Sequence, residues 1–140
     1  MFDINTAQAP AAFLLLKLGN TATNEYFITG ERDTYDWANT TWVHTPITKY
    51  ASYAMLDNLC TTDVEMTITP TSDGYQVKVS NPTDKVAFMV RLTAKQQGQL
   101  ICPAYWSDNY LTLAPGETRT VTCKLPSITD KTDVKIEVSK

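Results

Sequence analysis

The sequence contains no long apolar run. The longest, AAFLLL at residues 11–16, is too short to cross a bilayer. No basic region precedes it, so it also lacks the pattern of a signal peptide. We therefore predict neither a membrane span nor a secretion signal from this run.

Positive charge is also scarce. The 140 residues carry 12 Lys and Arg against 15 Asp and Glu, a net charge of −3. Because no basic patch stands out, we expect neither nucleic acid nor a membrane as a partner. With 43% hydrophobic and 19% charged residues, the composition is that of a soluble globular domain, and the length suits one such domain.

Cysteine and histidine, the residues of many metal and nucleophilic sites, are few. There are three cysteines and no CxxC pair, so we predict no zinc site, and their odd number leaves at least one unpaired within the chain. Cys123 shares a strand face with Val121 and Leu125 and is expected to be buried, whereas Cys60 is expected to react more readily. His44, the single histidine, has no catalytic context.

Motifs for cofactors and hydrolases are absent as well. The sequence has no GxSxG, HExxH, GxxxxGK or GxGxxG, and we expect no cofactor. Three close pairs of carboxylates occur, on predicted loops or polar strand faces, where we expect them to be solvated rather than catalytic: Asp33 with Asp36, Asp63 with Glu65, and Asp130 with Asp133.

What the sequence does contain is a series of short alternating segments bounded by turn residues. They predict about nine strands, and strands at this spacing are typical of an all-β sandwich. The segments are residues 13–18, 24–29, 64–69, 75–79, 86–93, 99–103, 110–113, 118–125 and 134–138.

A long connection, residues 31–58, does not fit this alternation. It carries two tryptophans and three tyrosines, which suggests that it is anchored rather than disordered. Part of it, residues 47–59, is predicted to form a short helix.

The sequence APGE at residues 114–117 predicts a type II turn. Pro115 presets φ at the second position, and Gly116 tolerates the positive φ required at the third. In the loop before it, the short side chains of Asp108 and Asn109 can bond to nearby backbone and hold a tight bend.

Five aromatic residues lie in predicted loops and are candidates for contact with a sugar or with another domain: Trp37, Trp42, Tyr105, Trp106 and Tyr110. Exposed aromatic faces stack on the apolar C–H face of pyranose rings. The same residues can instead pack on the sandwich or on a neighbouring domain, and both interpretations stay open.

Four stretches of the chain form a recognisable series. They are FLLLKL, the DWANTTW loop with the Tyr-Ala step after it, VKVSNPTDKVAFMVRL, and CPAYWSDNYLTLAPGETRTVT. The last is the most specific, with its Ser-Asp-Asn-Tyr loop ahead of Pro-Gly-Glu. Together they resemble the C-terminal immunoglobulin-like domain of exo-β-D-glucosaminidases and related β-mannosidase-like enzymes of glycoside hydrolase family 2.

This resemblance implies an immunoglobulin-like antiparallel β-sandwich that is a fragment of a larger hydrolase. Residues 1–140 would form one domain, with residues 1–60 supplying N-terminal strands and the long loop, and 61–140 the main sandwich strands. In such enzymes the catalytic glutamates sit on a TIM barrel, for which 140 residues are too few. The chain is therefore expected to have no catalytic residues and to pack on the catalytic and other domains of its parent enzyme.

The parent is expected to be a periplasmic or secreted bacterial protein. Other functions remain open: an autonomous carbohydrate-binding module that uses the loop aromatics to hold an oligosaccharide, an adhesion domain, or an independent enzyme.

Overall fold

The computed structural model describes residues 11–19 and 22–139. It is an all-β fold of antiparallel sheets, which confirms the predicted class. The chain divides into two compact units, residues 1–59 and 60–140, and each is described by itself.

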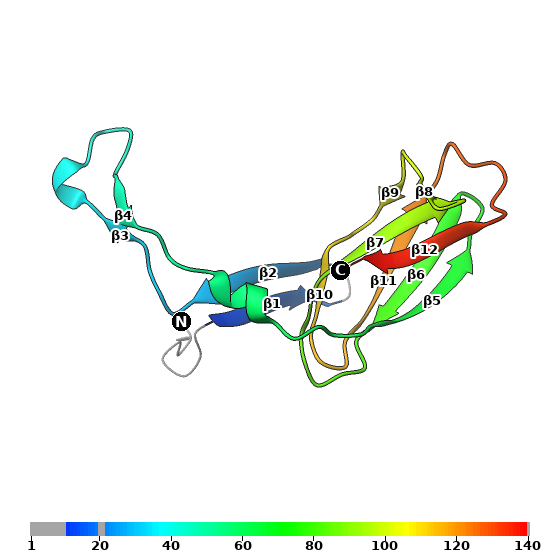
Figure 1. The fold of residues 1–140 in the computed structure, drawn as a ribbon, viewed down its shortest axis with the longest axis horizontal. Helices are drawn as coiled ribbons and strands as arrows, with labels where there is room; N and C mark the ends of the chain where they lie inside the picture. Colours follow the sequence, from blue (N-terminus) through cyan, green and yellow to red (C-terminus); the bar gives the residue numbers. More distant parts are fainter. Residues whose placement is uncertain (1–10, 20–21, 140) are drawn as a thin grey trace. The chain divides into compact units, whose positions relative to one another are not determined.

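The first unit contains two small antiparallel pairs of strands (Figure 1). Strands β1 (Ala11–Leu18) and β2 (Ala22–Thr29) pair along their full length, with Phe13 opposite Phe27 and their rings in edge contact at 5.5 Å. Strands β3 (Thr34–Tyr35) and β4 (Ile47–Lys49) form a second pair. We call residues 34–49, which comprise these two strands and the segment between them, the arm.

The helix predicted for residues 47–59 is wrong for most of its length. Ile47–Lys49 is strand β4, and only Ala54–Asn58 forms a helix, the 3₁₀ turn η3. Ile47 and Thr48 are β-branched and suit a strand, and the Thr48 hydroxyl donates to the Thr34 carbonyl across the pair at 3.1 Å.

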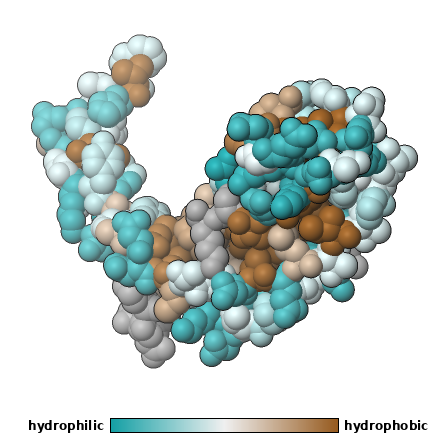
Figure 2. All heavy atoms as spheres, turned by 45° about the vertical axis from the view of Figure 1, so that its right-hand side comes forward, coloured by the Kyte–Doolittle hydropathy of each residue, from teal (hydrophilic) through white to brown (hydrophobic). Residues whose placement is uncertain are grey.

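The first unit has no buried core of its own among the described residues. Every described side chain in it is partly or largely exposed, and all buried hydrophobic residues lie in the second unit. Figure 2 shows brown hydrophobic residues reaching the surface on the face that it draws. Isolated two-stranded pairs are marginally stable in water, so this unit depends on further contacts.

The second unit is a sandwich of two four-stranded sheets (Figure 1). One has the order β5-β6-β11-β9, and the other has the order β10-β7-β12 with β8 paired to β7. The strands are β5 (Glu65–Pro70), β6 (Gly74–Ser80), β7 (Ala87–Gln96), β8 (Gln99–Leu100), β9 (Tyr105–Trp106), β10 (Leu111–Leu113), β11 (Thr118–Lys124) and β12 (Val134–Ser139).

The core follows the predicted alternation along β6 and β11. Val77 and Val79 are buried while Gln76 and Lys78 are exposed, and Val121 and Cys123 are buried beside exposed neighbours. Side chains from the other sheet complete the same core cluster: Ala87, Val90, Leu92, Ala94, Leu111, Leu113 and Ile136.

The predicted alternation fails in two places. Met89 has a positive φ of 54° and is exposed, so β7 changes face there, and Ala87 rather than Phe88 is buried. The register between β7 and β10 shifts at the same point, as in a β-bulge. Tyr105 and Trp106, predicted to lie in a loop, form strand β9 against Cys123 and Lys124 of β11.

Candidate functional site

The arm presents two exposed tryptophans from a rigidly bonded segment. Asp36 caps the 3₁₀ helix η2 (Trp37–Asn39): its Oδ1 accepts from the Asn39 backbone at 3.2 Å and its Oδ2 from the Asn39 side chain at 2.6 Å. The Trp37 ring packs at a tilt against the Tyr35 ring, with 5.4 Å between centroids. The Asp36 carboxylate therefore has a structural partner, and Trp37 is held in place although 72% of its surface is exposed.

Trp42 lies in a turn closed by Thr41 and His44. The Thr41 backbone N–H donates to the His44 carbonyl at 2.8 Å, and the Thr41 hydroxyl accepts from the His44 N–H at 3.1 Å. This turn leaves Trp42 96% exposed and Val43 exposed beside it. His44 thus helps to shape the turn through its backbone.

In the second unit, Asn109 fixes the loop before β10. Its side chain exchanges two hydrogen bonds with the backbone of Leu92 in β7. Tyr110, the next residue, has a positive φ of 55° and lies beside the Arg91 guanidinium, 5.9 Å from the ring centroid. Asp108 lies 3.6 Å from Arg119 of β11, so both acidic and amide side chains of this loop have partners.

The Pro-Gly turn is tied to the same region. Gly116 has a φ of +72°, as a type II turn requires, and the Glu117 N–H donates to the Ala114 carbonyl at 3.0 Å. The largely buried Glu117 side chain accepts from Ala114 N–H at 2.8 Å and from Arg119 at 3.1 Å. Arg119 therefore links the turn to the Asp108 loop.

Asn81 is a further structural residue that was not predicted. It is 1% exposed, and its side-chain amide donates to the carbonyls of Lys85, Leu113 and Ala114. The backbone carbonyl of Asn81 accepts a hydrogen bond from the Gly116 N–H at 2.9 Å. No local signal in the sequence shows that this asparagine reaches β10.

Two of the five candidate aromatics, Trp106 and Tyr110, line one groove of about 210 Å³ at the side of the sandwich. Arg91 and the exposed Leu100 line it too. Tyr105 is not among the lining residues and is 61% exposed, because successive residues of a strand point to opposite faces. The structure thus separates Tyr105 from Trp106.

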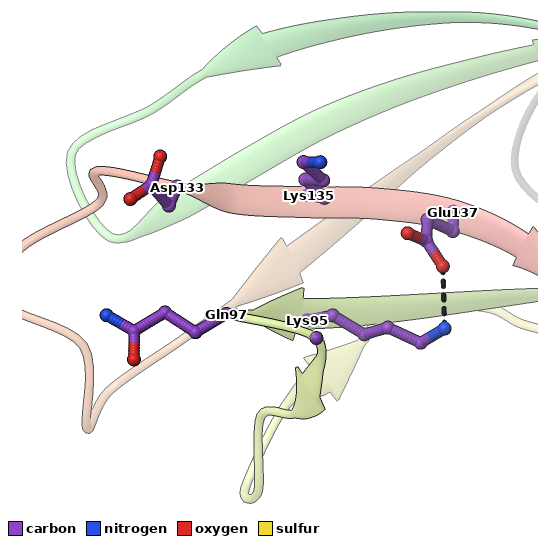
Figure 3. Close-up of a pocket in the computed structure, with 6 residues that line it drawn as sticks. Lys95, Gln97, Asp133, Lys135 and Glu137 are labelled. Atoms are coloured by element: carbon purple, nitrogen blue, oxygen red, sulfur yellow. Dashed lines mark hydrogen bonds and ion pairs between the residues drawn. The ribbon is translucent and has the colours of Figure 1, made fainter.

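A second hollow, of about 290 Å³, lies between the β7 end and β12 and is polar (Figure 3). Lys95 and Glu137 form an ion pair of 2.7 Å across it, and Gln97, Asp133 and Lys135 surround them. Since the principal charges pair with each other on an exposed surface, this hollow has no feature that selects a ligand.

A third hollow, of about 460 Å³, lies within the first unit and was not predicted. It is lined by the end of β2, residues 31–33, and the rings of Tyr35 and Tyr53. Both tyrosines belong to the long connection, and the β3–β4 pairing that brings them to one hollow has no alternation signal in the sequence.

The described residues contain no recognisable catalytic centre. Within residues 11–19 and 22–139, no three His, Cys, Asp or Glu side chains gather closely enough to hold a metal ion. Asp63, Glu65, Asp130 and Asp133 are exposed. Hydrogen bonds from Thr132 lower the pKa of Asp130, which keeps this carboxyl ionised rather than poised as a proton donor. None of the helices in the described part of the chain has the length and apolarity of a membrane span.

The model of the exo-β-D-glucosaminidase Ig-fold domain matches residues 42–140. The chain belongs to this family. The chain is 37% identical over 97 residues to an exo-β-D-glucosaminidase of Arthroderma benhamiae, covering 67% of the chain and 11% of the relative. It is 33% identical over 129 residues to that of Hypocrea jecorina, covering 82% and 14%.

Solved structures agree with the sequence relatives. The crystal structure of Amycolatopsis orientalis exo-chitosanase CsxA matches with a TM-score of 0.65 and 29% identity, over 84% of this chain and 15% of that one. The chain thus spans 11–15% of the length of these relatives. The resemblance to exo-β-D-glucosaminidases seen in the sequence is confirmed.

Proposed function

We propose that this Ig-fold domain is a non-catalytic part of a larger exo-β-D-glucosaminidase and that it packs on and stabilises the enzyme's catalytic portion. The relatives are seven to nine times longer than the part that matches this chain, in line with their covered share of 11–15%. The described residues supply no catalytic centre, so the hydrolytic groups belong to the remaining polypeptide.

The observation that carries this proposal is the uncovered surface of the first unit. Eleven of the sixteen exposed large hydrophobic residues belong to it, although it contains fewer residues than the second unit. Monomeric proteins seldom leave so much apolar surface in contact with water, and large exposed patches mark interaction sites. Its most exposed large hydrophobic residue is Trp42 of the arm, at 96%, and Trp37 and Val43 of the same segment are exposed as well.

Tryptophan and tyrosine at this surface suit a protein partner. Interfaces are enriched in these residues because a large ring buries much area at a small cost in side-chain entropy. The arm's backbone is held by the Asp36 cap and the Thr41 turn, so little further ordering of this segment is needed on docking. The partner we infer is the catalytic portion of the same polypeptide.

Association in trans tests the proposal. The 140-residue chain and the rest of its parent enzyme would be produced separately and mixed, and binding would be measured by calorimetry. We expect a complex that is weakened at least about tenfold by Trp37→Ala with Trp42→Ala, a typical loss for two interface anchors. Tyr105→Ala, an aromatic of the second unit that is 61% exposed, is the control and should leave affinity unchanged.

Absence of a complex, or equal weakening by Tyr105→Ala, would contradict docking through the arm.

A further inference from the structure

We propose that two copies of this chain associate edge to edge through strand β12, so that the sheet β10-β7-β12 continues from one copy into the other. β12 lies at the end of its sheet (Figure 1). Within residues 11–19 and 22–139, no strand pairs with its outer side. This association is independent of docking through the arm, because β12 belongs to the second unit.

The hydrogen bonds of β7 show which of its residues face β12. The Leu92 N–H and carbonyl bond to the Asn109 side chain, on the side of β7 that β12 does not occupy. The Ala94 carbonyl accepts from the Ile101 N–H on that same side. Because successive residues of a strand turn their N–H and carbonyl groups to opposite sides, the odd-numbered residues of β7 from Arg91 to Lys95 bond toward β12.

This register leaves alternate backbone groups of β12 pointing outward. Lys135 and Glu137 lie opposite odd-numbered residues of β7 and so bond to that strand. Ile136 and Val138 lie opposite even-numbered residues, so their N–H and carbonyl groups point to the open edge. Such a row of unpaired backbone groups is a template on which another strand can pair.

The two charged side chains of β12 suit a second copy of the same strand. Lys135 and Glu137 lie immediately before and after Ile136. If β12 pairs antiparallel with itself and Ile136 lies opposite its counterpart, each Lys135 faces the Glu137 of the second copy. These are the positions of an antiparallel pair at which side chains come closest, and opposite charges there stabilise the sheet. Charged side chains on an edge strand otherwise discourage pairing with foreign strands.

The same register satisfies the outward backbone groups. Ile136 would exchange both of its hydrogen bonds with its counterpart, and each Val138 N–H would donate to the Val134 carbonyl of the second copy. The Val134 N–H needs no partner there, because it donates to the Lys131 carbonyl at 3.2 Å. The Ile136 side chain is 7% exposed and stays in the core of its own sandwich, so the pairing requires no repacking.

Within the described part of one copy, Lys135 lacks the opposite charge that the pairing supplies. It lies directly opposite Lys95 of β7, which is a like charge. Lys95 is bonded to Glu137 at 2.7 Å (Figure 3). The Glu137 carboxylate has two oxygens, so it can also accept from Lys135 of the second copy. The pairing would therefore continue the ion pair of one copy into an alternating row of charges across both.

The other long open edge of the sandwich, β5, offers no such match. It has six residues like β12, but it ends in Pro70, which has no N–H to donate. Its single charged residue is Glu65, so pairing with itself would bring no opposite charge to any position. The self-complementary pattern therefore distinguishes β12 among the sheet edges of the described sandwich.

Sedimentation equilibrium of the 140-residue chain tests the pairing. Concentrations up to about 1 mM are needed, because an interface of this size is weak, and we expect a reversible dimer. Lys135→Glu sets glutamates against each other at both charged positions and should weaken dimerisation at least about tenfold. Lys78→Glu makes the same change of charge at an exposed residue of β6 and should have no effect.

Exchanging the charges separates pairing from a general effect of charge. Glu137→Lys sets lysines against each other and should weaken dimerisation as Lys135→Glu does. A mixture of these two single variants should form a heterodimer, because every position then has opposite charges again. The double variant Lys135→Glu with Glu137→Lys should dimerise as the native chain does.

Hydrogen exchange locates the contact without any substitution. The Ile136 and Val138 amides should exchange several-fold more slowly as the concentration rises, because they become bonded to the second copy. The Lys135 and Glu137 amides, already bonded to β7, should change little.

A chain that stays monomeric at about 1 mM would overturn the proposal. Equal weakening by Lys78→Glu, or a mixture of folded single variants that forms no heterodimer, would do the same. Self-association that is lost in Trp42→Ala and leaves exchange in β12 unchanged would place the contact on the arm instead.

Discussion

The Asn109 side chain pairs with the backbone of Leu92 as a neighbouring strand would. Leu92 N–H donates to Asn109 Oδ1 at 2.7 Å, and Asn109 Nδ2 donates to the Leu92 carbonyl at 2.9 Å. Asn109 precedes β10, the strand that pairs with this part of β7. Its side chain therefore continues the hydrogen bonding of β7 beyond the end of β10. Only a side chain with both a donor and an acceptor can do this.

Replacing Asn109 should therefore cost more than a loop position usually does. Asn109→Ala leaves a partly buried N–H and carbonyl of Leu92 without these bonds, and we expect a loss of about 2–4 kcal/mol. Urea denaturation followed by circular dichroism measures it. Asn109→Asp keeps the acceptor but not the donor, and an intermediate loss is expected. A loss below that of an exposed threonine such as Thr120→Ala would show that the pairing is not formed in solution.

Gly116 should not tolerate a β-branched residue. Its φ of +72° disfavours any side chain, although no atom lies within 4 Å of the position a Cβ would take. We expect Gly116→Val to destabilise the domain by about 1–3 kcal/mol through backbone strain alone. Gly116→Asn is the control, because asparagine adopts positive φ more readily, and it should lose clearly less. Equal losses in both variants would argue against strain as the cause.

Cys123 should be slow to react with thiol reagents. Burial raises its pKa to about 11, from an ordinary value of 9.0, so very little reactive thiolate forms near neutral pH. Cys60 and Cys102 are exposed and should be labelled quickly by an aromatic disulfide reagent. Labelling of all three at one rate in the native protein would contradict the register of β11.

The raised pKa of Cys123 also predicts a pH effect on stability. Below pH 9 the Cys123 thiol keeps its proton in both the folded and the unfolded protein. Above pH 9 the thiol ionises first in the unfolded protein, and this favours unfolding. The unfolding free energy of the native sequence should therefore fall more steeply between pH 9 and 11 than that of Cys123→Ala, which has no thiol to ionise. Identical pH profiles would mean that the thiol reaches solvent.

The isolated chain should not hydrolyse aryl β-glucosaminides. The described residues bring no pair of buried carboxylates together, and the family relatives are much longer. A chromogenic assay at high protein concentration checks this. Turnover abolished by one carboxylate substitution within this chain would require a catalytic site that the fold does not show.

The sequence predicted those features that depend on local alternation and turn chemistry. The faces of β6 and β11 and the burial of Cys123 follow from period-two patterns, and the turn at Gly116 follows from its residue types. The switch of face at Met89 was missed because a positive φ at methionine has no sequence signal. Strand β9 has two residues, too few to show alternation.

Long-range bonds account for most of what the sequence left undetermined. The roles of Asn81 and Asn109 depend on carbonyls and amides brought near by strand pairing. The hollow beside Asp33 depends on Ala51 lying opposite it. The aromatic residues of the arm were identified as candidates from composition, but their exposure required the structure, since a loop tryptophan can equally pack inside a domain.

The most direct test of docking through the arm compares the reactivity of its tryptophans in two contexts. Hydroxyl-radical footprinting with mass spectrometry would measure oxidation of Trp37 and Trp42 in the isolated chain and in the full-length parent enzyme, with Tyr105 as the internal reference. We predict that both tryptophans are oxidised several-fold more slowly in the parent, while Tyr105 is unchanged. Equal oxidation of Trp37 and Trp42 in the two contexts would contradict the account.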